Sequence, residues 1–185
     1  MIISLSGKLG SGKSFITKHI KNTFKEYNFE RKSFGYNLKK VTSFLTGVSM
    51  KTILSRKAKE LYLPEWNMTI GQMFQKLGTD AIRNNLHQNA WVISLFSDYT
   101  EDKNYIIDDV RFITEADAIK KRNGIIIRLE GDPANLRNKD TRNHNHSSET
   151  ELDNYENFDI VWQNEVSEKR LNDLMKIIED KIKSK

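Results

Sequence analysis

The stretch "ISLSGKLGSGKSF", Ile3 to Phe15, decides the fold of this chain. Within it, Gly7 and the run Gly12-Lys13-Ser14 fit the spacing G-x-x-x-x-G-K-[ST] of a phosphate-binding loop. Glycines let backbone N–H groups turn inward around phosphate oxygens, and the helix that follows such a loop adds the positive end of its dipole. The spacing therefore predicts a site for a nucleoside triphosphate, which we take to be ATP.

The sequence on either side of the loop agrees with this interpretation. "MIISLS" before it is β-branched and apolar, as in a buried strand, and "KSFITKHIKNTFKEY" after it has apolar residues at helical spacing. We expect Lys13 to bridge the outer phosphates and the Ser14 hydroxyl to hold Mg²⁺. A Gly/Ser-rich turn that matched the loop spacing by chance would need neither a strand before it nor a helix after it. The residues expected around the triphosphate are Gly7, Lys8, Gly10, Ser11, Gly12, Lys13, Ser14 and Phe15.

Length and composition limit the remaining possibilities. The 185 residues suffice for a single domain with a proper core, and the chain has no cysteine for disulfides or for a Cys-based zinc site. No apolar stretch approaches the length of a membrane span, so we expect a cytoplasmic protein, in the host cytoplasm if the source is viral. The net charge of +5 suits phosphate-bearing partners, but a Lys-, Asn- and Ile-rich composition explains it equally well.

Strand and helix patterns alternate along the chain, which predicts an α/β fold with a five-stranded parallel sheet flanked by helices. Residues 50–100 look almost wholly helical, without a convincing strand, and we expect a helical acceptor-binding insert over residues 37–100. The polar residues 132–157 lack apolar periodicity, and we interpret them as a mobile lid. The expected strands are "MIISLS", "RKSFGY", "NYIIDDV", "GIIIRLEG" and "FDIVWQN", and Ser167 is expected to cap the last helix.

Three charged residues end one of these strands, in "YIIDDVRF". A carboxylate beside a phosphate loop holds Mg²⁺ or orients an acceptor, but adjacent residues on a strand point to opposite faces. Only one of Asp108 and Asp109 can therefore face the site, and the other could cap a helix. Arg111 lies at the carboxyl end of the strand, where its guanidinium could bind a phosphate through two hydrogen bonds.

Two further segments carry candidate site residues. In "TIGQMFQKLGTDAIRNNL", Gln75, Asp80 and Arg83 are either surface polar residues or an acceptor site, and their clustering favours the acceptor site. In the polar stretch, Arg137 and Arg142 are candidates to neutralise the transferred phosphoryl group once the lid closes. The pair His144 and His146 has no third ligand in view, and it supports a zinc site poorly.

Taken together, these motifs resemble the bacteriophage-type deoxynucleoside monophosphate kinases, within the wider P-loop nucleotide kinase group. The resemblance covers nearly the whole chain, and its middle blocks are more specific than the phosphate loop. The blocks that carry it are "GKLGSGKS", "KSFGYNLKK", "QKLGTDAIR", "DDVRFITEA" and "HSSETELDNYENFDIVWQN". The resemblance implies transfer of the ATP γ-phosphoryl group to a deoxynucleoside monophosphate.

The resemblance also assigns roles residue by residue. Asp109, rather than Asp108, falls at the family's strand-end acid, and Ser148-Glu149 closes its lid motif. The family usually has an arginine where this chain has Gly71, which puts the identity of the acceptor in question. The residues implied to grip the acceptor are Lys39, Gln75, Asp80, Arg83 and Arg111. Independently of the resemblance, the aromatic residues Phe34, Tyr36 and Trp66 suit a flat base, and we expect Phe34 to bind the substrate.

From these assignments we expect catalysis by positioning and charge stabilisation, with Lys13, Arg111, Arg137 and Arg142 as its catalytic residues and Ser14 and Asp109 at the metal. We expect a monomer or homodimer that binds small-molecule substrates and forms no stable complex with nucleic acid. Two alternatives remain open. One is a small-molecule kinase of related build, like the phosphomevalonate kinases. The other is a basic P-loop ATPase module that binds nucleic acid, although the basic residues are scattered among acids.

Overall fold

The computed structural model describes residues 1–55, 57–133, 145–165 and 167–184, and the chain forms two compact units. The first, here called the sheet unit, comprises Met1–Lys32, Thr100–Asp140 and Glu151–Lys185. The second, the helical unit, comprises Ser33–Tyr99 and Thr141–Thr150. Neither unit is one continuous segment, because the chain leaves the sheet unit after its second strand, enters the helical unit and later returns. No helix among the described residues is long and apolar enough to cross a membrane.

The sheet unit is built on a five-stranded parallel sheet of order β2-β5-β1-β6-β7. Its central strands are almost continuous runs of apolar residues, as strands covered on both faces require. This sheet confirms the expected α/β fold. Its strands are β1 (Ile2–Ser6), β2 (Glu30–Lys32), β5 (Tyr105–Val110), β6 (Ile125–Glu130) and β7 (Ile160–Gln163). Its helices are α1 (Lys13–Thr23), a 3₁₀ turn at Lys25–Tyr27, α6 (Ile113–Lys120) and α8 (Glu168–Lys183).

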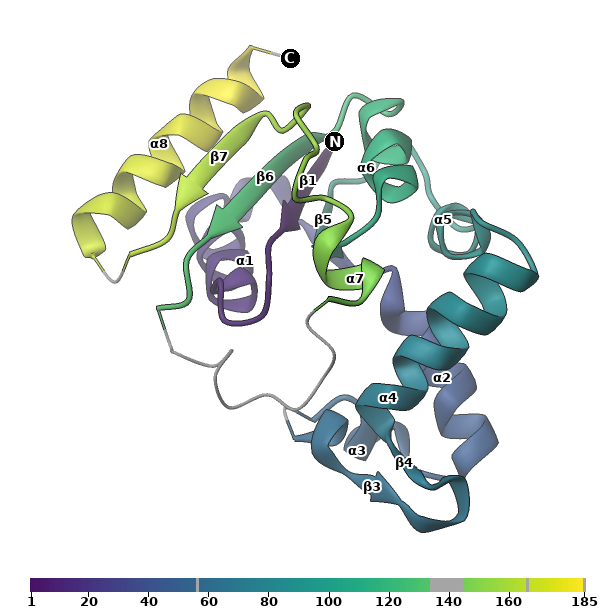
Figure 1. Cartoon of the computed structure of the whole chain (residues 1–185). Coiled ribbons are helices and arrows are strands. Elements are labelled where there is room, and N and C mark those ends of the chain that lie inside the picture. Colours follow the sequence, from purple (N-terminus) through teal and green to yellow (C-terminus); the bar gives the residue numbers. More distant parts are fainter. Residues whose placement is uncertain (56, 134–144, 166, 185) are drawn as a thin grey trace. The chain divides into compact units, whose positions relative to one another are not determined.

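Helices cover both faces of this sheet (Figure 1). On one face, Ile16 and Ile20 of α1 and Leu174 of α8 pack in the same core cluster as Ile3 and Leu5 of β1. Residues alternate across a strand, so Ile2 points to the other face, where Gly124 lies close to it and to Ile119 of α6. Ser167 caps α8 as expected, its hydroxyl accepting the N–H of Arg170 at 3.5 Å.

The helical unit has a smaller core of its own, formed by Ile53, Leu63, Ile70 and Met73. Its helices are α2 (Gly35–Thr46), α3 (Met50–Ile53), α4 (Ile70–Gln75), a π-helix at Lys76–Arg83, α5 (Ala90–Phe96) and α7 (Ser147–Thr150). It also contains 3₁₀ turns at Ala58–Glu60 and Pro64–Trp66 and an antiparallel pair of strands, β3 (Tyr62–Leu63) and β4 (Met68–Thr69).

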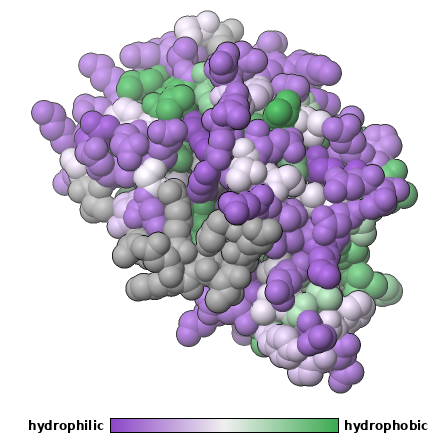
Figure 2. Space-filling model, in the orientation of Figure 1, coloured by the Kyte–Doolittle hydropathy of each residue, from purple (hydrophilic) through white to green (hydrophobic). Residues whose placement is uncertain are grey.

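This strand pair shows that the expectation of a strand-free insert is wrong. Each strand is only two residues long, too short to leave an alternating pattern in the sequence. The chain reverses between them through Pro64 and through Asn67, whose φ is +47°. Figure 2 shows one face of the molecule, on which hydrophilic side chains cover most of the surface and hydrophobic ones gather in separate small groups.

Two other expectations need adjustment. The second strand ends at Lys32, and α2 begins at Gly35, so the last residues of "RKSFGY" are not extended. The described part of the polar stretch 132–157 contains the short helix α7 and the buried Leu152. A four-residue helix and one apolar anchor are too little to produce a periodic pattern.

Candidate functional site

The phosphate loop lies between β1 and α1, and the Lys13 side chain folds back into it. Its Nζ donates to the carbonyl oxygens of Gly7 at 2.5 Å and Lys8 at 2.9 Å. Among the described residues no side chain caps the N-terminus of α1, and its first turn contains no acid. The positive end of the helix dipole, the loop glycines and an ammonium group therefore face one place, which suits an anion.

Glycine is favoured at two positions of the loop because the backbone there has positive φ, and side chains from other segments lie close to both. Gly10 has φ +80°, and a Cβ there would lie 1.7 Å from Oδ1 of Asp132, just after β6. Gly12 has φ +84°, and its Cβ would lie 2.3 Å from Nδ2 of Asn164, just after β7. That same amide nitrogen donates to the carbonyl oxygen of Ser11 at 2.8 Å. Neither supporting residue was predicted: Asp132 belongs to no motif, and Asn164 ends the block "FDIVWQN" without a role of its own.

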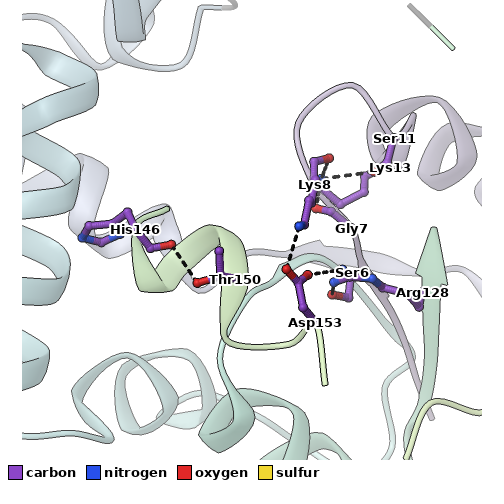
Figure 3. A network of polar contacts seen from close by, with 9 residues as sticks. All are labelled: Ser6, Gly7, Lys8, Ser11, Lys13, Arg128, His146, Thr150 and Asp153. Carbon is purple, nitrogen blue, oxygen red and sulfur yellow. Dashed lines mark hydrogen bonds and ion pairs between the residues drawn. The ribbon is translucent and has the colours of Figure 1, made fainter. Parts of the chain in front are cut away.

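A second set of contacts ties Lys8 of the loop to Asp153, in the chain that follows α7 (Figure 3). Asp153 accepts from Nζ of Lys8 at 2.6 Å and from Nη2 of Arg128 at 2.8 Å. Arg128, on β6, is buried, and its Nη1 donates to the hydroxyl of Ser6 at 3.2 Å, one residue before the loop begins. The carboxylate of Asp153 thus links Lys8, at the start of the loop, to Arg128 on β6.

At the end of β5 the two neighbouring acids have different surroundings. Asp108 is buried, and its Oδ2 accepts from Nε and Nη2 of Arg31, on β2, at 2.9 and 2.6 Å. Asp109 is only half-buried and points to the opposite side of the strand. Asp109, the less buried of the two acids, is the one that the family resemblance implies at the metal.

Arg111 follows in the turn that leads from β5 into α6. Its backbone N–H and that of Phe112 both donate to Oε2 of Glu115, at 2.9 and 3.3 Å. Glu115 is buried, so it fixes the turn from which the Arg111 side chain projects. Glu115 could have been predicted from the sequence, because it lies three residues after Phe112, the spacing of a capping box.

In the helical unit, the block "KLGTDAIR" is wound as a π-helix, Lys76–Arg83, directly after α4. The amide N–H of Asn84 bonds to the carbonyl oxygen of Thr79, the i→i−5 pairing that defines this winding. π-Helices are rare, and those that occur lie frequently at functional sites. Nothing in the periodicity of the sequence distinguished this segment from an α-helix.

Two of the implied acceptor residues lie in this π-helix. Arg83 is buried, and its Nη1 donates to the carbonyl oxygen of Gln88 at 3.0 Å, which restrains the guanidinium. Asp80 is exposed, and its Oδ1 lies 3.8 Å from Nε2 of His146, just before α7. The other ring nitrogen of His146 accepts the N–H of Ser148 at 3.2 Å, so the proton of a neutral ring belongs on the nitrogen that faces Asp80.

The other implied acceptor residues lie on neighbouring elements of the helical unit. Gln75 ends α4, Gly71 is buried within it, and Lys39 is half-buried on α2. Phe34 precedes α2, and its buried ring packs edge-to-face on Phe96, with the ring centroids 6.3 Å apart. Phe34 is therefore also part of the packing of this unit.

The structure thus gathers the candidate residues into two groups, each within one unit. The sheet unit holds the loop, including the exposed Ser14 and Phe15, with Asp109 and Arg111. The helical unit holds Phe34, Lys39, Gln75, Asp80 and Arg83, with Ser148 and the buried Glu149 on α7. Arg137, Arg142 and His144 lie outside the described residues.

The donor atoms of the sheet unit suit magnesium better than zinc. The Ser14 hydroxyl and the Asp109 carboxylate are hard oxygen donors, the kind that Mg²⁺ takes together with substrate phosphates. Over residues 1–55, 57–133, 145–165 and 167–184, no group of three or more His, Cys, Asp or Glu side chains could hold a metal by itself. A metal here would depend on the phosphates for its remaining ligands.

Two comparisons of the sequence with known proteins agree. A model of the deoxynucleotide monophosphate kinase family matches residues 31–178, which contain the π-helix and the end of β5. A provisionally named deoxynucleotide monophosphate kinase of Acanthamoeba polyphaga mimivirus is 32% identical over 179 residues, covering 89% of this chain and 88% of the viral protein. The phosphate loop itself lies before the stretch that the family model matches.

The fold has relatives among solved structures of kinases. The shikimate kinase of Aquifex aeolicus superposes with a TM-score of 0.54 at 15% identity, over 97% of this chain and 96% of that one. The shikimate kinase of Bacteroides thetaiotaomicron gives a TM-score of 0.55 at 12% identity, over 99% and 98% of the two chains. At such identities the likeness establishes the P-loop kinase fold alone.

Proposed function

Since this chain belongs to the deoxynucleotide monophosphate kinase family, we propose that it transfers the γ-phosphoryl group of ATP to a deoxynucleoside 5′-monophosphate, yielding a dNDP and ADP. The observation that carries the proposal is the family match across residues 31–178. Those residues include Arg83 and Arg111, two forked cations suited to a phosphate. The nucleotide kinase function follows from the family, and the specific reaction is our proposal.

The donor half of the proposed reaction uses the phosphate loop. Lys13, held at the centre of the loop by the carbonyls of Gly7 and Lys8, would exchange these contacts for the outer phosphates of ATP. The residues Gly7 to Phe15 would enclose the triphosphate. Ser14 and Asp109 would hold Mg²⁺, which when bound neutralises charge on the phosphate oxygens and so favours attack at the γ-phosphorus.

The acceptor half would use Arg83 and Arg111 as a fork for the monophosphate, with Lys39, Gln75 and Asp80 holding the rest of the nucleotide and Phe34 near its base. Arg83 suits this role because its guanidinium is already oriented by the Gln88 carbonyl, which lowers the entropy lost on binding. An acceptor phosphate is already a nucleophile at neutral pH, so the reaction needs no general base. Catalysis is then positioning and charge stabilisation.

The proposed lid supplies the last cations. Arg137 or Arg142 would close over the phosphoryl group while it is in transfer, where added positive charge lowers the barrier most. A closed lid would also exclude water and so limit hydrolysis of ATP.

A coupled assay of ADP release tests the proposed function. Purified protein is supplied with ATP and Mg²⁺ and with each deoxynucleoside and ribonucleoside monophosphate in turn, and separately with DNA. We expect ADP release that depends on at least one deoxynucleoside monophosphate, with one dNDP formed for each ADP. Turnover that DNA stimulates, or that no monophosphate stimulates, would contradict the proposal.

A further inference from the structure

A hydrogen bond from α5 reaches the backbone of the π-helix Lys76–Arg83. Nε1 of Trp91, the second residue of α5, donates to the carbonyl oxygen of Gly78 at 2.8 Å. The indole is 8% exposed, so this bond forms away from water, where its loss would leave a polar group without compensation. A side chain that bonds into the backbone ladder of a helix is one of the recognised causes of a local change in its course.

The packing at Gly78 supports the same arrangement. A Cβ on Gly78 would lie 2.6 Å from Cδ2 of Leu38, on α2, so the π-helix approaches α2 closely at this residue. Gly78, Thr79 and Arg83 are the buried residues of the segment. In i→i+5 winding, Arg83 comes to lie over Gly78, whose carbonyl Trp91 engages, whereas in an α-helix residues five apart point in different directions.

Winding therefore decides where Arg83 points. Each residue that changes from i→i+4 to i→i+5 pairing rotates all that follow it, and eight residues are wound in this way. The short connection from the π-helix to α5 then returns to Arg83, because the Gln88 carbonyl accepts from its Nη1. Trp91 lies three residues beyond Gln88, so one short stretch of chain supplies both the carbonyl that holds Arg83 and the indole that bonds to Gly78.

We propose that Trp91 is a positioning residue of the acceptor site: its indole N–H stabilises the π winding that aims Arg83 at the acceptor phosphate. Trp91 does not touch the substrate, and it acts through the Gly78 carbonyl. The inference rests on the proposed function, because it assigns Arg83 to the acceptor. Of the three tryptophans, Trp66 and Trp162 lie outside this contact.

Trp91→Phe tests the inference, since it removes the N–H and keeps an aromatic ring. We expect KM for the best deoxynucleoside monophosphate to rise by about 3- to 15-fold, with KM for ATP unchanged. Trp162→Phe, a matched control on β7 of the sheet unit, removes an indole elsewhere and should leave both KM values unchanged. A merely structural role for Trp91 would lower the active fraction, and hence kcat, without separating the two KM values.

A second measurement decides the matter if Trp91→Phe does not fold. The Trp91 indole N–H signal is assigned in ¹H–¹⁵N spectra by elimination, with Trp66→Phe and Trp162→Phe. We expect it to exchange slowly with solvent and to shift when the monophosphate is added. Fast exchange without a shift, or a folded Trp91→Phe with an unchanged monophosphate KM, would overturn the inference. If the wild type phosphorylates no monophosphate, the proposed function fails first, and the inference falls with it.

Discussion

The phosphate loop and the π-helix are two candidate binding elements built by opposite means. The loop would bind through its backbone: glycines shape it, and one contiguous run of eight residues from Gly7 to Ser14 contains the whole pattern. The π-helix would act through side chains, chiefly Arg83, whose direction we attribute to a winding that Trp91 and Leu38 contact from other helices. A site made by backbone can be recognised from spacing, whereas one made by side chains depends on what packs around it.

The two elements also differ in what holds them in place. The loop is braced by Asp132, Asp153 and Asn164, all far along the chain and all polar. The π-helix is braced within its own unit, by an indole and an apolar side chain. We therefore expect loop variants to affect ATP and π-helix variants to affect the acceptor. Six substitutions, grouped in four experiments, test this separation in order of expected effect.

The largest effect should come from Lys13→Ala. Removing the cation that would bridge the transferring phosphates should lower kcat by at least about 10³-fold in a protein that remains folded. The measurement is turnover at saturating substrates, with circular dichroism as the check on folding. Lys18→Ala, an exposed lysine on the same helix, is the control. Near-normal turnover of a folded Lys13→Ala would remove Lys13 from the mechanism.

Next in size are Arg83→Ala and Arg111→Ala, which should raise KM for the monophosphate by about 10- to 150-fold and leave KM for ATP nearly unchanged. The reason is the loss of one charge-assisted contact to the acceptor phosphate. Steady-state kinetics with each substrate varied in turn provides the measurement, and Lys51→Ala on α3 is the control. Should both variants weaken ATP instead, the division into donor and acceptor halves would be wrong.

A third experiment distinguishes the roles of Asp109 and Asp108, the two acids at the end of β5. Asp109→Asn should raise the Mg²⁺ concentration needed for half-maximal turnover by about 10- to 100-fold, because an acid that orients the metal is lost. Asp108→Asn should leave that requirement unchanged and lower the free energy of unfolding by about 1–3 kcal/mol, since it weakens the contact with Arg31. The reverse pattern would assign the metal to Asp108.

The smallest effect is expected from Asp153→Asn. Without the carboxylate that joins Lys8 to Arg128, the loop should be less ordered before ATP binds, and KM for ATP should rise by about 3- to 10-fold. KM for the monophosphate should not change. Asp173→Asn, an exposed acid on α8, controls for the loss of one negative charge. An equal rise in both KM values would show that Asp153 supports the whole protein rather than the loop.

Most of the sheet could be predicted from the sequence, because its signals are local. Buried parallel strands are short apolar runs, the loop between β1 and α1 has a fixed spacing, and a serine marks the start of α8. The strands β3 and β4 could not be predicted, because two residues cannot establish a period. The clustering of Gln75, Asp80 and Arg83 was also visible, and their family resemblance gave them a role.

By itself the sequence determined which groups are available for the chemistry: a loop for phosphates, two acids at a strand end, and arginines for an acceptor. Only the tertiary structure decided how they are held. In the folded chain Arg31 bonds to Asp108, whereas Asp109 is half-buried. Asp132 and Asn164 lie against the loop. Residues Lys76–Arg83 form a π-helix whose Gly78 carbonyl accepts from the indole of Trp91. The physical reason is that a backbone pattern is fixed by neighbours in sequence, whereas the direction of a side chain is fixed by neighbours in space.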